Sequence, residues 1–409
     1  MNNKKIKIAI IDDGVNVFEF QIPQVKLNIE IDKYGFIKNI KNYDIQINSH
    51  GTICSAIIQK YLNHKNVEFV SIKILDTITK RGTINQLIYA LNWCIYNDID
   101  VINCSFGTIK YIDFNIVKNI INKTSEKGII IVSAINNNGI YSLPACLNNV
   151  IGVKNDYYYN NGMFKLRWYP FDDIEITTSG THELIKKNNI IFKTISSNSF
   201  ATPMITAYVS DIIFENGKLS HNEILLKLEK KAKTVIGKYI SGIVPYIWNI
   251  PQNNYDKIYN NFDFKTYNNI ISKYLKYNEI SINIPIVNIC GLNFNKCLDF
   301  IFKLSKHLEQ DNFYYRIITE YFDELKYGFV LFPQNCDKKI FCNNIFDKFK
   351  NEILILHLDN NFECDITIKI NNSIVIYYND EISIIKTFDC YFIEESVNYV
   401  YNLLIQEND

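Results

Sequence analysis

The first 235 residues alternate short runs rich in Val and Ile with segments whose apolar residues repeat at helical spacing. The alternation predicts strands joined by helices, and such chains form a parallel sheet through right-handed crossovers. The runs are nearly continuously apolar, as expected for strands that are covered on both faces. We therefore predict an α/β fold built on a doubly wound parallel sheet. The predicted strands are 6–11, 67–75, 99–106, 128–135 and 149–154, and the predicted helices include 83–98 and 113–128.

A second α/β pattern follows near the C-terminus. From about residue 236 to 280 the sequence becomes rich in Asn and Tyr and loses clear periodicity. Beyond it, strands are predicted at 284–292, 327–333, 352–358, 365–370 and 373–378, with helices at 295–310 and from about 394 to 404. A chain of 409 residues is long for one domain. We predict a first domain at 1–235, a connecting region at 236–280 and a second, smaller α/β domain at 281–409.

Charge and hydropathy argue against two classes of partner. The 43 basic and 43 acidic residues give a formal net charge of zero, so no overall field attracts nucleic acid or a membrane surface. No stretch of about 18 apolar residues predicts a membrane span. The opening "MNNKKIKIAIIDDGV" has too short an apolar run for a signal peptide. We expect no nucleic-acid partner and no membrane partner.

Three polar residues that could form a nucleophilic site stand at the ends of predicted elements. "IAIIDDGV" ends a strand in Asp12, "SHGTICSAII" places His50 where a helix begins, and "SSNSFATPMI" places Ser199 ahead of an apolar helix. Alone, each has a structural explanation: Asp12 could form a turn, His50 could be a structural histidine, and Ser199 could cap a helix. The proline that follows Ser199 would then belong to the first turn, where proline is tolerated. A nucleophilic serine needs a base, an acid that orients the base, and donors for the oxyanion. Strand ends of an open α/β sheet are where such groups converge.

Five motifs together resemble the subtilisin-like serine proteases, the subtilase family. "IAIIDDG", "HGT", "INCSFG", "SAINNNG" and "SNSFATP" follow the family's order between residue 6 and about residue 215. The resemblance implies a subtilisin-like catalytic domain at 1–235 with the triad Asp12, His50 and Ser199, and with Asn136 as an oxyanion donor. It also implies two segments that pair with the peptide substrate, formed by Ser105, Phe106 and Gly107 and by Ser133, Ala134 and Ile135.

The sequence departs from the family pattern beside the expected site. Ile135 stands where the family usually has Gly, in the wall of the pocket for the residue before the cut, so we expect a shortened pocket and a small residue there. Ser197 and Asn198 replace the usual Gly and Thr ahead of the nucleophile. "TTSG" at 177–180 only partly resembles the family's Ala-Pro-Gly.

Two family features are expected to be missing. The first predicted strand begins at about residue 6, which leaves no room for a prodomain, and the span from His50 to the strand at 67–75 is too short for the calcium-binding loop of secreted relatives. Cys54, Cys94, Cys104 and Cys146 lie in apolar runs, as buried thiols do. We therefore predict a cytoplasmic protein with no metal and no cofactor.

The start of the second domain has the layout of a phosphate-binding loop without its key residues. "IVNICGLNFNKCLDF" places Gly291 and Lys296 between a strand and a helix. The second Gly of the motif is missing, the loop is one residue short, and Cys297 replaces the Ser or Thr. Nucleotide binding is the less favoured reading, and we expect a scaffold that recognises a substrate or a partner protein.

Two functions fit these observations. The favoured one is a cytoplasmic serine endopeptidase that cleaves a narrow peptide or protein substrate, with leader removal from a ribosomally made peptide precursor as one such task. The alternative is a catalytically silent subtilase-fold binding module, in which Ile135 blocks the cleft and residues 281–409 engage a partner protein. Retention of all the catalytic motif residues favours the enzyme.

Overall fold

The structure is a computed structural model that describes residues 5–237 and 284–406 with short gaps. The gaps are at 21, 23–24, 42–43, 111–112, 138–141, 148, 160–161, 169–173, 312, 314, 322–323, 325–328, 333–340, 343–351, 360–363 and 379–382. The chain divides into two compact units, Met1–Ile109 with Asp113–Ser241 and Lys110–Ile112 with Gly242–Asp409. The predicted connecting region at 236–280 lies outside the described residues beyond 237, and the predicted domain boundaries stay predictions.

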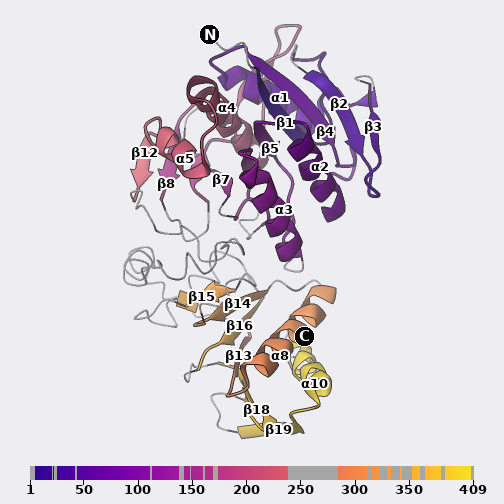
Figure 1. Cartoon of the computed structure of the whole chain (residues 1–409), viewed down its shortest axis with the longest axis vertical. Coiled ribbons are helices and arrows are strands. Elements are labelled where there is room, and N and C mark those ends of the chain that lie inside the picture. Colours follow the sequence, from indigo (N-terminus) through magenta and orange to yellow (C-terminus); the bar gives the residue numbers. More distant parts are fainter. Residues whose placement is uncertain are drawn as a thin grey trace. The chain divides into compact units, whose positions relative to one another are not determined.

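The first unit is built on a ten-stranded sheet, as the alternating sequence pattern predicts (Figure 1). From β9 to β2 all neighbours pair in parallel, while β8 on β9 and β3 on β2 are antiparallel. The strand order is β12 (Thr234–Ile236), β8 (Phe164–Arg167), β9 (Ile176–Thr178), β7 (Val150–Asn155), β6 (Ile130–Ala134), β5 (Val101–Cys104), β1 (Ile6–Asp12), β4 (Val67–Lys73), β2 (Val25–Ile31) and β3 (Ile37–Asn39).

Helices cover this sheet in two packed pairs. α1 (His50–Tyr61) packs on α4 (Asn198–Asn216), and α2 (Ile84–Tyr96) packs on α3 (Phe114–Glu126), which Figure 1 shows in front of the sheet; α5 (His221–Glu229) follows α4. A hairpin of β10 (Glu183–Ile185) and β11 (Ile191–Lys193) stands apart from the main sheet. The predicted doubly wound α/β fold is confirmed.

α4 is the central helix of the unit, because both its apolar and its small polar residues are buried. Ser197 caps it by accepting a hydrogen bond from the Phe200 N–H. The N-cap is therefore Ser197 and Pro203 lies in the second turn, so the structural explanation of Ser199 as an N-cap with its proline in the first turn is wrong. Because proline has no N–H, the Ser199 carbonyl lacks its usual helical donor, and the Ser105 hydroxyl donates to that carbonyl instead at 3.5 Å.

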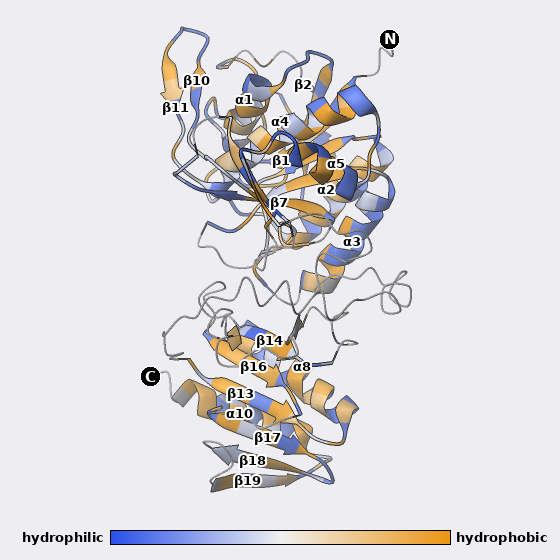
Figure 2. Ribbon diagram, turned by 90° about the vertical axis from the view of Figure 1, so that its left-hand side faces the viewer, coloured by the Kyte–Doolittle hydropathy of each residue, from blue (hydrophilic) through white to orange (hydrophobic). Residues whose placement is uncertain are grey.

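The second unit contains a seven-stranded sheet with two packed helices, so the predicted second, smaller α/β domain is also confirmed. Pairing is parallel from β15 to β17 and antiparallel beyond it. Figure 2 shows apolar residues concentrated in its central strands. The strand order is β15 (Val330–Leu331), β14 (Tyr315–Thr319), β16 (Ile353–His357), β13 (Ile286–Cys290), β17 (Ile366–Ile370), β18 (Ser373–Tyr378) and β19 (Ser383–Asp389), and the helices are α8 (Phe294–Gln310) and α10 (Ile393–Gln406).

The loop after β13 is not shaped to hold a phosphate. Gly291 has φ +143°, and a Cβ built there would lie 2.1 Å from the Ile370 carbonyl oxygen, so this glycine serves close packing against β17. The Lys296 ammonium donates to the Cys390 carbonyl at 3.2 Å and lies over the Tyr391 ring. Lys296, the lysine of the phosphate-loop layout, is therefore hydrogen-bonded to the segment before α10.

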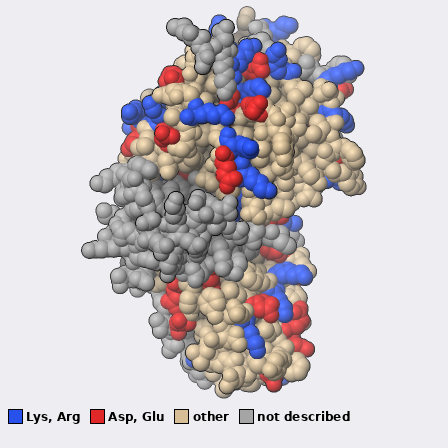
Figure 3. All heavy atoms as spheres, viewed as in Figure 1, with Lys and Arg blue, Asp and Glu red and all other residues tan. Residues whose placement is uncertain are grey.

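The described surface shows neither a membrane-crossing element nor a one-sign field on the face in view. No helix in the described part of the chain combines the length and apolar character that crossing a membrane requires. Figure 3 shows Lys and Arg interspersed with Asp and Glu on that face of both units. This mixing agrees with the zero net charge.

Candidate active site

Asp12, His50 and Ser199 meet where β1 ends, α1 begins and α4 begins. His50 Nδ1 lies 2.7 Å from Asp12 Oδ2, and His50 Nε2 lies 2.9 Å from Ser199 Oγ. Asp12 is fully buried, whereas 23% of the His50 side chain is exposed. The residues are 38 and 149 positions apart along the chain. They form one hydrogen-bonded series from a buried acid to a hydroxyl at the surface of the site.

The neighbouring acid, Asp13, fixes the start of α1. Its own N–H donates to Asp12 Oδ1 at 2.9 Å, which leaves Asp12 Oδ2 to His50. Its buried carboxylate accepts the N–H groups of His50 at 3.1 Å and Gly51 at 2.8 Å, and it pairs with the Lys80 ammonium. A carboxylate at a helix N-terminus satisfies free amides and complements the helix dipole. Sequence analysis missed this role, and the doubled Asp at the strand end was the available signal.

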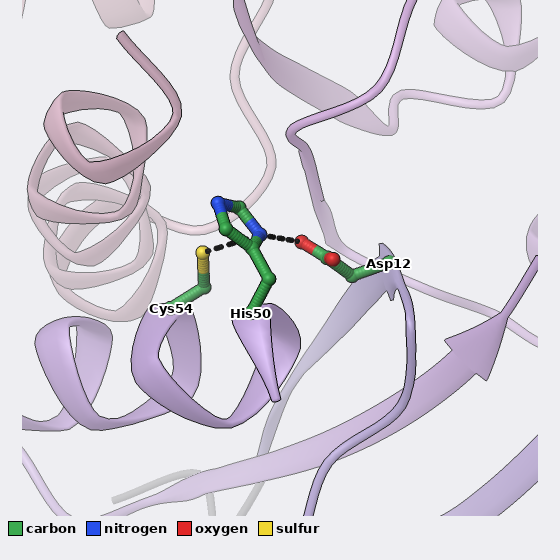
Figure 4. Close-up of side chains that lie close together, drawn as sticks. All are labelled: Asp12, His50 and Cys54. Atoms are coloured by element: carbon green, nitrogen blue, oxygen red, sulfur yellow. Dashed lines mark hydrogen bonds and ion pairs between the residues drawn. The ribbon is translucent and has the colours of Figure 1, made fainter. Parts of the chain in front are cut away.

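Cys54 lies one turn after His50 and packs against the site. Figure 4 shows its sulfur on one side of the His50 ring and the Asp12 carboxylate on the other. Sγ is 3.7 Å from His50 Nδ1 and 3.7 Å from Ser105 Oγ. The pKa of this thiol is raised by burial, so the sulfur carries a proton at neutral pH.

The side chains of Asp12, His50 and Cys54 could in principle hold a metal ion. Their ligand atoms lie within 4.8 Å of one another, and a thiolate, an imidazole and a carboxylate suit Zn²⁺. An ion there would need the deprotonated thiol and would replace the hydrogen bond between Asp12 and His50. Metal binding and the hydrogen-bonded series are therefore mutually exclusive, and the geometry favours the series.

The hydroxyl of Ser199 has a second neighbour, Ser197. The two Oγ atoms are 3.0 Å apart, and Ser197 Oγ also accepts the Phe200 N–H that caps α4. The Phe200 ring stacks on His50 with centroids 4.8 Å apart. The first turn of α4 thus positions both the hydroxyl and the imidazole that it contacts.

Asn198 ties the loop after β6 to the start of α4. Its Nδ2 donates to the carbonyls of Ile135 at 3.2 Å and Asn136 at 2.9 Å, and its Oδ1 accepts the Asn155 N–H at 2.7 Å. Asn136 is half-buried, and its own N–H donates to Ser142 Oγ. The replacement of Thr by Asn at 198 therefore has a clear structural role, whereas oxyanion donation by the Asn136 side chain stays a prediction.

The two predicted substrate segments extend from adjacent strands. Ser105, Phe106 and Gly107 follow β5, while Ser133, Ala134 and Ile135 lie at the end of β6, its parallel neighbour. The first segment is partly accessible, with Gly107 exposed, and the second is buried, with Ile135 only 4% exposed. A Cβ at Gly107 would lie 2.4 Å from the Leu143 carbonyl oxygen, so a side chain there would displace the loop at 143.

Replacing Gly180 by Ala is expected to disturb the start of α4. The new Cβ would lie 2.2 Å from the Ser197 carbonyl oxygen and 2.7 Å from its nitrogen, closer than atoms can approach. We expect the free energy of unfolding in urea to fall by about 1–3 kcal/mol, the usual cost of overpacking. Hydrogen exchange of the first-turn amides of α4 should also accelerate.

The matched control is Gly217→Ala at the other end of α4. Gly217 has φ +80° but no atom within 4 Å of a built Cβ, so this change adds backbone strain without a clash. It should lower stability while exchange at the first turn of α4 stays as in the wild type. Equal hydrogen-exchange rates of the first-turn amides of α4 in Gly180→Ala and Gly217→Ala would contradict the role assigned to Gly180.

Comparison with known proteins identifies the family of the first unit. Residues 3–244 match the Subtilase family. The chain belongs to the subtilase family. The predicted family is thereby confirmed, whereas the roles predicted for the individual motif residues stay predictions.

Similar proteins cover only part of this chain. The minor extracellular protease Epr of Bacillus subtilis (strain 168) is 28% identical over 218 residues, which make up 51% of this chain and 32% of Epr. The epidermin leader peptide-processing serine protease EpiP of Staphylococcus epidermidis is 25% identical over 240 residues, 46% of this chain and 50% of EpiP. Among solved structures, Sphericase is 20% identical with a TM-score of 0.46, covering 58% of this chain and 88% of Sphericase.

Proposed function

We propose that this subtilase is a serine endopeptidase whose triad is Asp12, His50 and Ser199. The observation that carries the proposal is the unbroken hydrogen-bonded series from the buried Asp12 carboxylate through His50 to Ser199 Oγ. His50 takes the hydroxyl proton as Ser199 Oγ bonds to the peptide carbonyl carbon, and Asp12 stabilises the imidazolium that forms. His50 then gives that proton to the leaving amine, and water releases the acyl group by the same steps.

The oxyanion of the tetrahedral intermediate is assigned to the start of α4. The Ser199 N–H lies in the first turn, where free amides and the helix dipole favour negative charge. The Asn136 side chain is the proposed second donor, because Asn198 holds its backbone beside this turn. The peptide is proposed to pair as an added strand with residues 105–107 and 133–135.

The pH dependence of the reaction follows from His50. Burial, the largest single cause, opposes the charged imidazolium, but the Asp12 carboxylate and the Cys54 sulfur together outweigh it and raise the pKa of His50 well above 6.5. His50 accepts a proton only when neutral, so raising its pKa moves the onset of activity to higher pH. We expect the rate at which a fluorophosphonate labels Ser199 to rise with a midpoint above 6.5, measured from about pH 5 to about pH 10. A midpoint at or below 6.5 would contradict this assignment.

Ile135 is proposed to restrict the residue before the cut. It is buried at the end of β6, where the family usually has Gly. Against a peptide library with that position varied, the wild type should cleave after Gly, Ala or Ser, and Ile135→Gly should add cleavage after larger residues. Two substrates whose side chains at this position differ by about three methylene groups should be discriminated by roughly 2 kcal/mol in the free energy of the transition state. An unchanged profile in Ile135→Gly would remove Ile135 from the pocket.

The proposed task is the maturation of peptide precursors, by cleavage of a narrow range of substrates in the cytoplasm. EpiP, whose name describes leader peptide processing, supports this substrate class. Residues 281–409 are proposed to recognise the substrate or a partner protein. The test compares new N-termini in cells that produce the wild type or Ser199→Ala. A few new ends in peptide precursors are expected, whereas many ends across abundant proteins would indicate broad turnover.

A further inference from the structure

The second unit has a topological switch point between β14 and β16. In the order β15-β14-β16-β13-β17, the chain leaves β14 towards β15 and leaves β16 towards β17, on the other side. In open α/β sheets, ligands bind outside the carboxyl ends of the strands at such a point. The residues that follow β14 and end β16 are therefore the place to look for a second binding site.

A buried ionisable pair stands at this point. His357 ends β16, and its Nδ1 lies 2.7 Å from Oε1 of Glu324, which follows β14. The two residues are 1% and 0% exposed. The second carboxylate oxygen, Glu324 Oε2, is buried and accepts no hydrogen bond from the residues that the structure describes. Because a buried carboxylate is costly unless its oxygens are satisfied, this oxygen needs a donor that the described residues do not supply.

The surrounding groups are also acceptors or aromatic rings. Glu320 accepts the Asp359 N–H, and Asp359 accepts the Tyr321 hydroxyl. Burial, followed by the carboxylates of Asp359, Glu320 and Glu324, raises the pKa of Tyr321, so all three carboxylates act on this ring. The Phe294 ring is 37% exposed and lies 5.1 Å from Tyr321 and 5.4 Å from His357.

We propose that this acidic and aromatic cluster (Phe294, Glu320, Tyr321, Glu324, His357 and Asp359) binds a guanidinium or ammonium group of a basic peptide. Carboxylates supply acceptors and negative charge, and the His357 tautomer that donates Nδ1–H to Glu324 presents Nε2 as one more acceptor. Aromatic faces beside them attract cations. A phosphate would be repelled by the three carboxylates.

A metal ion fits the cluster less well than an organic cation. Among the described residues, three potential metal ligands come within reach of one ion only at Asp12, His50 and Cys54. A guanidinium needs no such convergence, because its N–H donors are spread over a plane and can reach separate carboxylates. The proposed site does not depend on the chemistry of Ser199.

The test is calorimetric titration of full-length Ser199→Ala, which cannot cut the probe. The probes are acetyl-Gly-Arg-Gly-amide, the same peptide with neutral citrulline in place of Arg, and free arginine amide. The Arg peptide is expected to bind and the citrulline peptide is not. Adding Glu324→Gln should weaken binding of the Arg peptide at least about tenfold, the effect of losing one charge-assisted hydrogen bond. Tighter binding of the peptide than of arginine amide indicates a peptide ligand, whereas equal binding indicates a small cation.

Two further sets of variants keep the test decisive. Glu395→Gln removes an exposed carboxylate on α10 and should leave the affinity unchanged. If Glu324→Gln does not fold, Glu320→Gln and Asp359→Asn at the more accessible edge of the cluster should each weaken binding instead. Equal binding of the citrulline peptide, unchanged affinity in the cluster variants, or binding of Zn²⁺ but not of the Arg peptide would each overturn the proposal.

Discussion

Replacing Asp12 by Asn is expected to slow the reaction of Ser199 by about 10⁴-fold while the fold is retained. The Asp12 carboxylate accepts a hydrogen bond from His50 Nδ1 at 2.7 Å and thereby leaves the lone pair on Nε2, which faces Ser199 Oγ. An Asn side chain can instead donate to Nδ1 and favour the wrong tautomer. The pseudo-first-order rate of fluorophosphonate labelling, followed by intact mass, measures the loss directly.

Asp211→Asn is the matched control for this change. Asp211 is a buried carboxylate on the far part of α4, and it accepts hydrogen bonds from Asn63, which follows α1. Its replacement should lower the free energy of unfolding, while the folded protein is labelled at the wild-type rate. If Asp12→Asn were labelled as fast as the wild type, Asp12 would have no role in orienting His50.

Ser199→Ala is expected to lower peptide hydrolysis by about 10⁶-fold. The change removes the only atom that forms the acyl bond, and it leaves His50, the helix amides and the peptide-pairing segments in place. Residual hydrolysis should come from binding and oxyanion stabilisation alone. The measurement is kcat on the best substrate found in the peptide library, with the folded state checked by urea unfolding.

Ser197→Ala is the control for Ser199→Ala, because the two hydroxyls are 3.0 Å apart. Loss of the Ser197 cap should reduce stability by about 1 kcal/mol, whereas hydrolysis should persist. Abolished hydrolysis in Ser197→Ala together with activity in Ser199→Ala would show that the nucleophile had been assigned to the wrong serine.

Much of the fold could be predicted because the central strands are covered on both faces. β1, β4, β5 and β6 are almost wholly buried, so each appears as a continuous apolar run. The outer strands β2, β3 and β8 are partly exposed, and β14 carries a charged residue in a short run. Their patterns are too weak to predict without knowing the neighbours, and none was predicted.

The site residues also divide into those that the sequence identifies and those that only the structure identifies. Asp12, His50 and Ser199 could be found because each stands in a short motif, and the structure brings all three within hydrogen-bonding distance. The roles of Asp13 and Asn198 depend on contacts with segments about 40 to 60 residues away. The Glu324–His357 pair has no motif at all and becomes visible only when β14 and β16 are paired.

The most direct test of the central claim is the intact mass of the purified chain after treatment with a fluorophosphonate, run beside Ser199→Ala. The hydrogen-bonded series predicts one adduct on the wild type and none on the variant. No adduct on the folded wild type would contradict an activated serine, and the catalytically silent binding module would then be the better account of this subtilase.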